Sequence, residues 1–144
     1  MVVIDATGPC AGVTAAALGL AREAGELRAV TVVDVQKCCG GAEEDLEPVE
    51  RNLEGVVGSL RAAGAACSGQ IQRMVNRNVS RGLLRAVAEF RPTLVIIGAD
   101  NGPSWAPGDR PSRTMLRKAG CPVLVVPEPV GRHRAEHEEA RTPA

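Results

Sequence analysis

The feature that most restricts the fold of this chain is an alternation of short apolar runs with helix-like patterns over residues 1–126. Most of these runs are rich in β-branched residues, as expected of strands that are buried on both faces of a parallel sheet. The runs lie at residues 2–4, 29–35, 67–75, 94–98 and 123–126. Strands that alternate with helices are joined by right-handed crossovers. The sequence therefore predicts an α/β fold, a doubly wound open sheet of five parallel strands with about four helices.

Helical patterns fill the gaps between these runs. The most regular covers residues 49–63, where apolar residues recur three or four positions apart. Further helices are expected over 11–24 and 79–90. The expected apolar face of the first consists of Val13, Ala17, Leu20, Ala21 and Ala24. A short one begins near Pro111 and ends before Gly120, in line with the preference for proline at the start of a helix and glycine after its end. The expected inner face of the 79–90 helix consists of Val79, Leu83, Val87 and Phe90.

The length of 144 residues suits one domain. We expect this domain to cover residues 1–127, followed by a flexible tail over residues 128–144, which is charged and has no sustained apolar period. No apolar run approaches the ~20 residues that a spanning helix requires. The start of the chain also lacks a secretory signal. We therefore expect a cytoplasmic protein that does not insert into a membrane.

Composition argues against several classes of function. Lys plus Arg and Asp plus Glu number 17 each, which removes the electrostatic case for a chain dedicated to nucleic acid. With one Phe, one Trp and no Tyr, the chain cannot build a base-stacking surface. The five cysteines form no C-x-x-C pair, so neither a disulfide framework nor a zinc site is expected. Adjacent Cys38 and Cys39 are interpreted as loop residues rather than a redox pair.

Charge is unevenly distributed along the chain. Residues 1–66 carry five basic and ten acidic side chains, whereas residues 67–126 carry nine and three. The second half is therefore expected to face anions, unless the two halves pair with each other. Arg residues recur every fourth position over residues 77–85. A solvated helix face is favoured over an acidic partner or lipid head groups, because Glu89 has the spacing of an intrahelical ion pair with Arg85.

The candidate ligand site follows from the predicted topology. In an open parallel sheet the ligand crevice lies beyond the carboxyl ends of the strands, where the strand order reverses. The loops after the first and fourth strands therefore matter most. The helix near Pro111 offers unpaired N–H groups that suit a phosphate, and Arg110, Ser112 and Arg113 can add donors. Asp109 argues against an anion there, since its carboxylate would compete for the same N–H groups.

Catalytic motifs are not found. Neither the Walker pattern nor G-x-G-x-x-G occurs. Both histidines belong to an H-x-x-E-H match at residues 133–137, in a charged segment with no apolar face to hold it. We predict no catalytic residue and no metal site. Trp105, a lone indole in a Gly/Pro loop, is expected to cover the crevice or to lie in an interface.

Four stretches give the chain a likeness to a known family: VVIDATG, VTVVDV, LVIIGADNG and SRTMLRKAGCPVLVVPEP. On the basis of these stretches, residues 2–127 resemble the universal stress protein family. Members that bind ATP use G-x-x-G, nine further residues, then Gly followed by Ser or Thr. Here Gly98 matches the first position, and Asn101 stands at the second with Gly102 one step later. The last pair is Pro111-Ser112 when counted strictly, or Asp109-Arg110 when the motif is aligned from its C-terminal side.

The resemblance implies a role for each matching residue. Asp5 and Val35 would flank an adenine or ribose, while Gly98 and Ser112 would face the phosphates. Gly102 and Gly108 are the nearest glycines to the unmatched positions. The cofactor would be ATP or another adenine nucleotide. The complete set of predicted cofactor-binding residues is Asp5, Ala6, Thr7, Val35, Gly98, Gly102, Gly108, Arg110 and Ser112.

The leading interpretation is a non-catalytic regulatory domain that binds adenine nucleotide and forms a homodimer through an edge strand at residues 123–126. Residues 75–98 also resemble the version of this domain in the cytosolic tail of bacterial cation/proton antiporters, and Met1 stands directly before the first strand, as in a domain cut from a longer protein. Two alternatives stay open. One is a dimerisation module with an empty crevice, and the other is a weak ATP hydrolase in which Asp5 or Asp100 holds magnesium.

Overall fold

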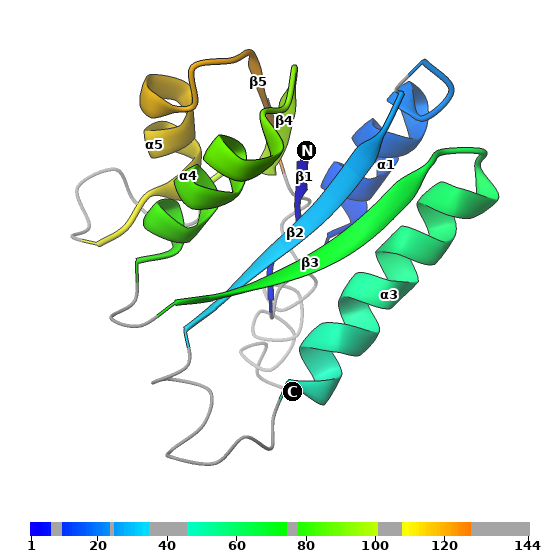
Figure 1. Cartoon of the computed structure of the whole chain (residues 1–144), viewed down its shortest axis with the longest axis horizontal. Helices are drawn as coiled ribbons and strands as arrows, with labels where there is room; N and C mark the ends of the chain where they lie inside the picture. The colour runs from blue at the N-terminus through cyan, green and yellow to red at the C-terminus, as the bar shows by residue number, and fades with distance from the viewer. Residues whose placement is uncertain (7–9, 24, 35–45, 75–77, 101–107, 128–144) are drawn as a thin grey trace, which may run out of the picture.

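The sheet has five parallel strands in the order β3-β2-β1-β4-β5 (Figure 1). A computed structural model describes residues 1–6, 10–23, 25–34, 46–74, 78–100 and 108–127. The strands are β1 (Val2–Val3), β2 (Leu27–Asp34), β3 (Cys67–Met74), β4 (Val95–Gly98) and β5 (Val123–Val126). The helices within the described ranges are α1 (Ala11–Leu20), α3 (Glu47–Ala62), α4 (Val79–Phe90) and α5 (Pro111–Lys118). The predicted fold class is confirmed.

Strand β1 is short but holds the centre of the sheet. It pairs in parallel with β2 on one side and with β4 on the other. The amide of Ile4 donates to the carbonyl of Val30, and the amide of Ile96 donates to the carbonyl of Met1, both at 2.9 Å. From β1 the chain builds outward to β2 and β3 first, and then to β4 and β5 on the other side. The strand order therefore reverses between β1 and β4, as the sequence predicts.

The two edges of the sheet differ in length. At one edge, β3 pairs with β2 over eight residues, from Leu27 opposite Cys67 to Asp34 opposite Met74. At the other, β5 pairs only with β4 and is the edge strand that the sequence predicts. The predicted tail over residues 128–144 lies outside the described residues. Within the described ranges, no helix combines the length and the apolar character needed to cross a membrane.

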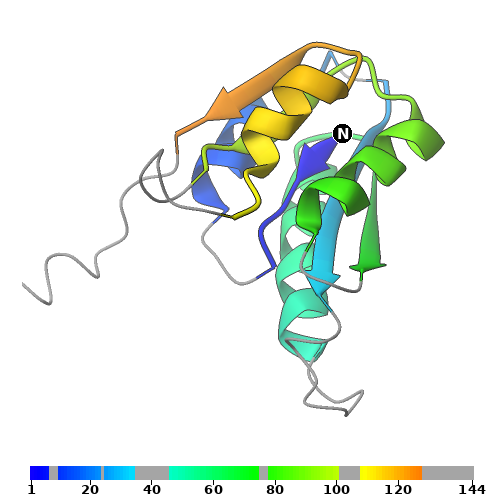
Figure 2. The same cartoon turned by 90° about the vertical axis from the view of Figure 1, so that its left-hand side faces the viewer.

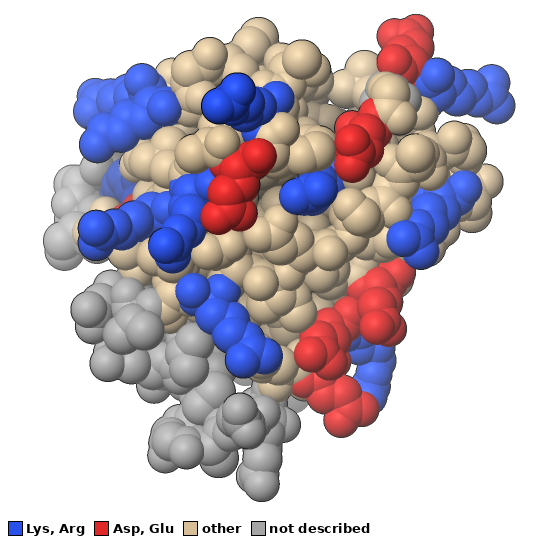
Figure 3. Space-filling view, in the orientation of Figure 1, with Lys and Arg blue, Asp and Glu red and all other residues tan. Residues whose placement is uncertain are grey.

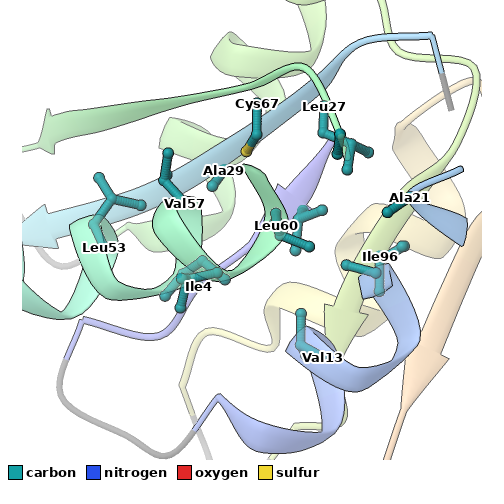
Figure 4. Close-up of a cluster of buried hydrophobic side chains, with 14 residues drawn as sticks. Ile4, Val13, Ala21, Leu27, Ala29, Leu53, Val57, Leu60, Cys67 and Ile96 are labelled. Atoms are coloured by element: carbon teal, nitrogen blue, oxygen red, sulfur yellow. The ribbon is translucent and has the colours of Figure 1, made fainter. Parts of the chain in front are cut away.

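Helices cover both faces of the sheet (Figures 1 and 2). Helices α1 and α3 pack on one face, where Leu53, Val57 and Leu60 point onto Ile4 and Ala29 (Figure 4). Helices α4 and α5 cover the other face with a second apolar cluster. The apolar period predicted for α3 is confirmed, because its apolar side chains are buried at every predicted helical repeat from Val49 to Leu60. Burying one such Val or Leu side chain contributes about 1.5–3 kcal/mol.

Helix α1 is shorter than predicted. Its regular hydrogen bonding ends at Leu20, and the amide of Ala21 then donates to the carbonyl of Leu18, which tightens the last turn. Val13 and Ala17 are buried as the periodic pattern predicts, and Ala21 is buried just past the helix. Ala24, the last residue of the predicted apolar face, lies outside the described residues.

The inner face predicted for α4 is confirmed but incomplete. Leu83 is fully buried, and Val79, Val87 and Phe90 are half-buried against the same apolar cluster. The helix also turns small residues to the sheet: the buried ones include Ser80, Gly82 and Ala86. The physical reason is close approach, since a Cβ on Gly82 would lie 2.8 Å from Cγ of Met74 and 2.9 Å from Cγ1 of Val32.

Gly82→Ala tests this close approach. We expect it to lower the free energy of unfolding by about 1–3 kcal/mol, because the new methyl group overpacks the contact with β2 and β3. Gly55→Ala is the matched control, since a Cβ at Gly55, also in a helix, meets nothing within 4 Å. It should raise stability by up to about 1 kcal/mol. Urea denaturation measures both, and a Gly82→Ala protein as stable as the control would contradict the packing described.

Candidate functional site

The loops after β1 and β4 leave the sheet at the same end, because these strands are parallel neighbours. Asp5 is exposed and Ala6 half-buried just past β1, while Gly98 is half-buried at the end of β4. The amide of Ala99 donates to the carbonyl of Val126 at 2.8 Å, which extends the β4 pairing by one residue. Asp100 follows and turns toward α5. This end of the sheet is the candidate site.

The predicted site residues fall into two groups. The structure describes Asp5, Ala6 and Gly98 at the strand ends, and Arg110 and Ser112 at the start of α5. Ser112 is buried, Arg110 is half-buried, and Gly108 lies nearby in the exposed chain before α5. The other predicted site residues, Thr7, Val35 and Gly102, lie outside the described residues. The same is true of the motif residue Asn101 and of Trp105.

Asp100 caps helix α5. Its Oδ1 accepts the backbone N–H of Ser112 at 2.8 Å, and its Oδ2 accepts that of Arg113 at 3.3 Å. A carboxylate is favourable at this position because the first amides of a helix lack intrahelical partners and its N-terminus carries a partial positive charge. Sequence reasoning weighed Asp100 only as a magnesium ligand. Lying eleven residues before the helix, it carries no local capping signal.

No backbone N–H in the first turn of α5 is left for another acceptor. Pro111 has none, the two amides that follow are bound to Asp100, and Thr114 donates to the carbonyl of Arg110 at 3.0 Å. The predicted phosphate-binding N–H groups are therefore already satisfied within the chain. A phosphate could reach them only by displacing Asp100.

Asp109 does not compete at α5 as predicted, but caps α4 instead. Its Oδ2 accepts the N–H of Ser80 at 2.8 Å, and its Oδ1 accepts the Ser80 hydroxyl in a short hydrogen bond. Asn78 completes this cap by accepting the N–H of Arg81 at 2.9 Å. A carboxylate does lie at the α5 N-terminus, as expected, but it belongs to Asp100 and not to Asp109. Gly108, with a φ of 134°, adopts a backbone conformation that L side chains rarely take, directly before Asp109.

Asn52 of α3 fixes the chain after β1. Its Nδ2 donates to the carbonyl of Asp5 at 3.2 Å and to Sγ of Cys10 at 3.7 Å. Cys10 is the N-cap residue of α1, and its thiol also donates to the Asp5 carbonyl, at 3.7 Å. The two ends of the β1–α1 loop are thereby held by one side chain from a third element. Sequence reasoning missed Asn52, which occupies an ordinary polar position of an amphipathic helix.

Three cysteines lie within the described residues, and none of them forms a disulfide. Burial raises the pKa of the Cys67 thiol, which keeps it protonated and unreactive. Cys10 and Cys121 are half-buried, and the Cys38–Cys39 pair lies outside the described residues. No group of three or more His, Cys, Asp or Glu side chains in the described ranges could hold a metal ion.

Much of the positive charge of the second half of the sequence lies on the side of the molecule formed by α4 and α5. Lys and Arg side chains gather over α4 and α5, whereas Asp and Glu gather over α3 (Figure 3). The ion pair expected between Arg85 and Glu89 is not formed. Among described residues, ion pairs are instead found between Arg28 and Glu26 and along α3. The exposed basic residues of the α4–α5 side are Arg81, Arg85, Arg91, Arg113, Arg117 and Lys118.

Asp109→Asn tests the cap on α4. We expect it to lower the free energy of unfolding by about 1–2 kcal/mol, because a neutral amide replaces the charged acceptor of two hydrogen bonds. In a double-mutant cycle with Ser80→Ala the losses should be clearly less than additive. Glu89→Gln, which removes an exposed carboxylate without an ion pair, should change stability by less than about 0.5 kcal/mol. Additive losses in denaturant titrations would show that Asp109 and Ser80 act independently.

Comparisons with known proteins place this geometry in a wider context. No protein-family model matches the sequence, and no curated protein is significantly similar to it. Solved structures match over most of the chain. A universal stress protein family member from Burkholderia pseudomallei is 24% identical, with a TM-score of 0.63, and the match covers 88% of this chain and 95% of that one.

Two further matches were solved with a nucleotide. A universal stress protein from Archaeoglobus fulgidus in complex with dAMP is 22% identical, with a TM-score of 0.62 over 87% of this chain and 94% of that one. A universal stress protein family protein from Arabidopsis thaliana with AMP bound is 14% identical, with a TM-score of 0.58 over 90% and 92% of the two chains. Likeness at these identities establishes a shared fold.

Proposed function

Because the chain has the universal stress protein fold, we propose that it belongs to that family and acts as a non-catalytic regulatory domain that binds an adenine nucleotide. The observation that carries the proposal is that β1 and β4, which are parallel neighbours, finish at the same end of the sheet, where the strand order reverses. Proteins of the same fold bind dAMP and AMP. Neither activity nor ligand is inherited from a fold, so the site itself must support the proposal.

The loop after β1 is the proposed nucleoside side of the site. Asn52 holds the Asp5 backbone at 3.2 Å, while the Asp5 side chain is exposed. A carboxylate on a fixed backbone is well placed to accept hydrogen bonds from ribose hydroxyls or an adenine amino group. We assign Ala6, Thr7 and Val35 to the same side. Gly98, Gly102, Gly108, Arg110 and Ser112 are assigned to the phosphate side.

Binding is favoured over hydrolysis. The hydrolase alternative needs Asp5 or Asp100 to hold magnesium and a base to activate water. Both carboxylate oxygens of Asp100 already accept backbone N–H groups, which makes this side chain a structural cap. The sequence also lacks a Walker lysine, and its two histidines belong to the segment at residues 133–137.

Calorimetric titration tests the proposed binding. We expect adenosine or AMP to bind the purified chain, and Asp5→Asn to weaken that binding about tenfold, because the amide is a poorer acceptor than the carboxylate. Glu23→Gln is the matched control, since it removes one exposed carboxylate between the C-terminus of α1 and the start of β2, at the opposite end of the strands from Asp5. Its affinity should equal that of the wild type. If no adenine ligand produces binding heat or a shift in melting temperature, that result would favour the dimerisation module with an empty crevice.

A second candidate function is homodimerisation through β5. This strand is an edge strand, and Leu124 on it is 41% exposed. An unpaired edge with an exposed leucine suits antiparallel pairing with a second copy. Such a dimer is compatible with nucleotide binding. The resemblance to antiporter domains also stays a prediction, which transmembrane segments encoded in frame before Met1 would support.

Leu124→Lys tests the dimer. If two β5 strands pair, we expect the wild type to sediment as a dimer and the variant as a monomer, because a charged side chain on an edge strand opposes pairing. Ala88→Lys places the same charge on the exposed side of α4 and should leave the dimer intact. A monomeric wild type in sedimentation velocity would exclude this assembly.

A further inference from the structure

We infer that Asp100 sets the ligand preference of this crevice: it keeps phosphate off the start of α5, so the site takes adenosine or a monophosphate in preference to ATP. This inference rests on the adenine nucleotide binding proposed above. It concerns which member of that ligand class the site accepts. Asp100 is not among the cofactor-binding residues predicted from the sequence.

Asp100 ties the start of α5 to the end of β4: it lies two residues after Gly98 and accepts the N–H of Ser112. A bound phosphate is normally held there by free backbone N–H groups and the positive end of the helix dipole. Here Asp100 takes the N–H groups of Ser112 and Arg113, Pro111 has none, and Thr114 bonds within the helix. The donors that a triphosphate would need are therefore satisfied by a carboxylate of the same chain.

Displacement of Asp100 by phosphate is unfavourable for two reasons. It breaks two charge-assisted hydrogen bonds, which are stronger than those between neutral groups. It also leaves a carboxylate close to a phosphate of like charge, and like charges at short range oppose each other. This unfavourable contribution to the binding free energy rises with the number of phosphate charges that must approach Asp100. It is absent for an uncharged nucleoside.

The guanidinium group of Arg113 does not offset this penalty. Arg113 is exposed, and the interaction of an exposed cation with an anion is weakened by water and salt. The amides of α5, by contrast, are fixed by the helix and point at one position. For phosphate binding, the α5 backbone N–H groups that already bond to Asp100 therefore matter more than the exposed charge of Arg113.

Titrations of the full chain with adenosine, AMP and ATP, in EDTA so that metal ions do not neutralise phosphate, test the inference. We expect the wild type to bind adenosine at least about tenfold more tightly than ATP. Asp100→Asn should strengthen ATP binding about tenfold and leave adenosine binding within about twofold, because the neutral amide removes the repulsion and frees a backbone N–H. Thermal melts establish that the variant is folded. If it is not, Asp100→Ser provides the same neutralisation with a smaller side chain.

Asp109→Asn is the matched control, because it removes one carboxylate from the same connection between β4 and α5 but one that caps α4. It should leave the ratio of adenosine to ATP affinity unchanged. A wild type that binds ATP as tightly as adenosine would overturn the inference while the proposed function stands. Equal effects of Asp100→Asn and Asp109→Asn would overturn it as well, since only net charge would then matter. Failure of all three ligands to bind any variant would overturn the proposed function itself.

Discussion

The need to bury a parallel sheet on both faces governs this structure. Strand β1 spans only Val2–Val3, yet it can occupy the centre because β2 and β4 bond to it on either side and two layers of helices cover it. Its position also creates the reversal of strand order. The candidate site lies where the chain leaves β1 and β4, because the helices that follow these two neighbouring strands cover opposite faces of the sheet.

Helix termini impose the second constraint. Each helix begins with backbone N–H groups that need acceptors. In the connection from β4 to α5, two carboxylates supply them: Asp100 near the start binds α5, and Asp109 near the end binds α4. The connection is thereby attached to two helices on the same face of the sheet. The same bonds that stabilise the fold determine which donors the crevice retains for a ligand.

Charge and ligand preference are separate properties of this molecule. The α4–α5 side is basic, which by itself suggests an anionic ligand (Figure 3). The directed donors at the start of α5 are nevertheless occupied by Asp100. Net charge describes long-range attraction, whereas the occupancy of individual N–H groups decides what can bind at contact distance. The chain thus combines the universal stress protein fold with a start of α5 whose backbone N–H groups are already bonded within the chain.

The sequence by itself determined the type and order of the elements, the reversal of strand order, the edge position of β5 and the buried stripe of α3. These follow from apolar periodicity and β-branched content, which are properties of neighbouring residues. It also indicated the end of the sheet at which the candidate site lies, because topology fixes where parallel strands end. It placed the C-terminal end of α1 too late. It also gave no sign of the close approach at Gly82 of α4, since the space open to Gly82 is set by Val32 and Met74 on other elements.

Only the tertiary structure decided which carboxylate caps which helix and which side chain holds the β1 loop. Asp109 bonds to Ser80 across 29 positions of the chain, and Asn52 bonds to the Asp5 carbonyl across 47. Asp100 likewise reaches Ser112 across 12 positions. No local pattern encodes such pairs, because any carboxylate or amide that folding brings within hydrogen-bond distance can satisfy the same backbone group. The identity of the partner is therefore a consequence of how distant segments pack.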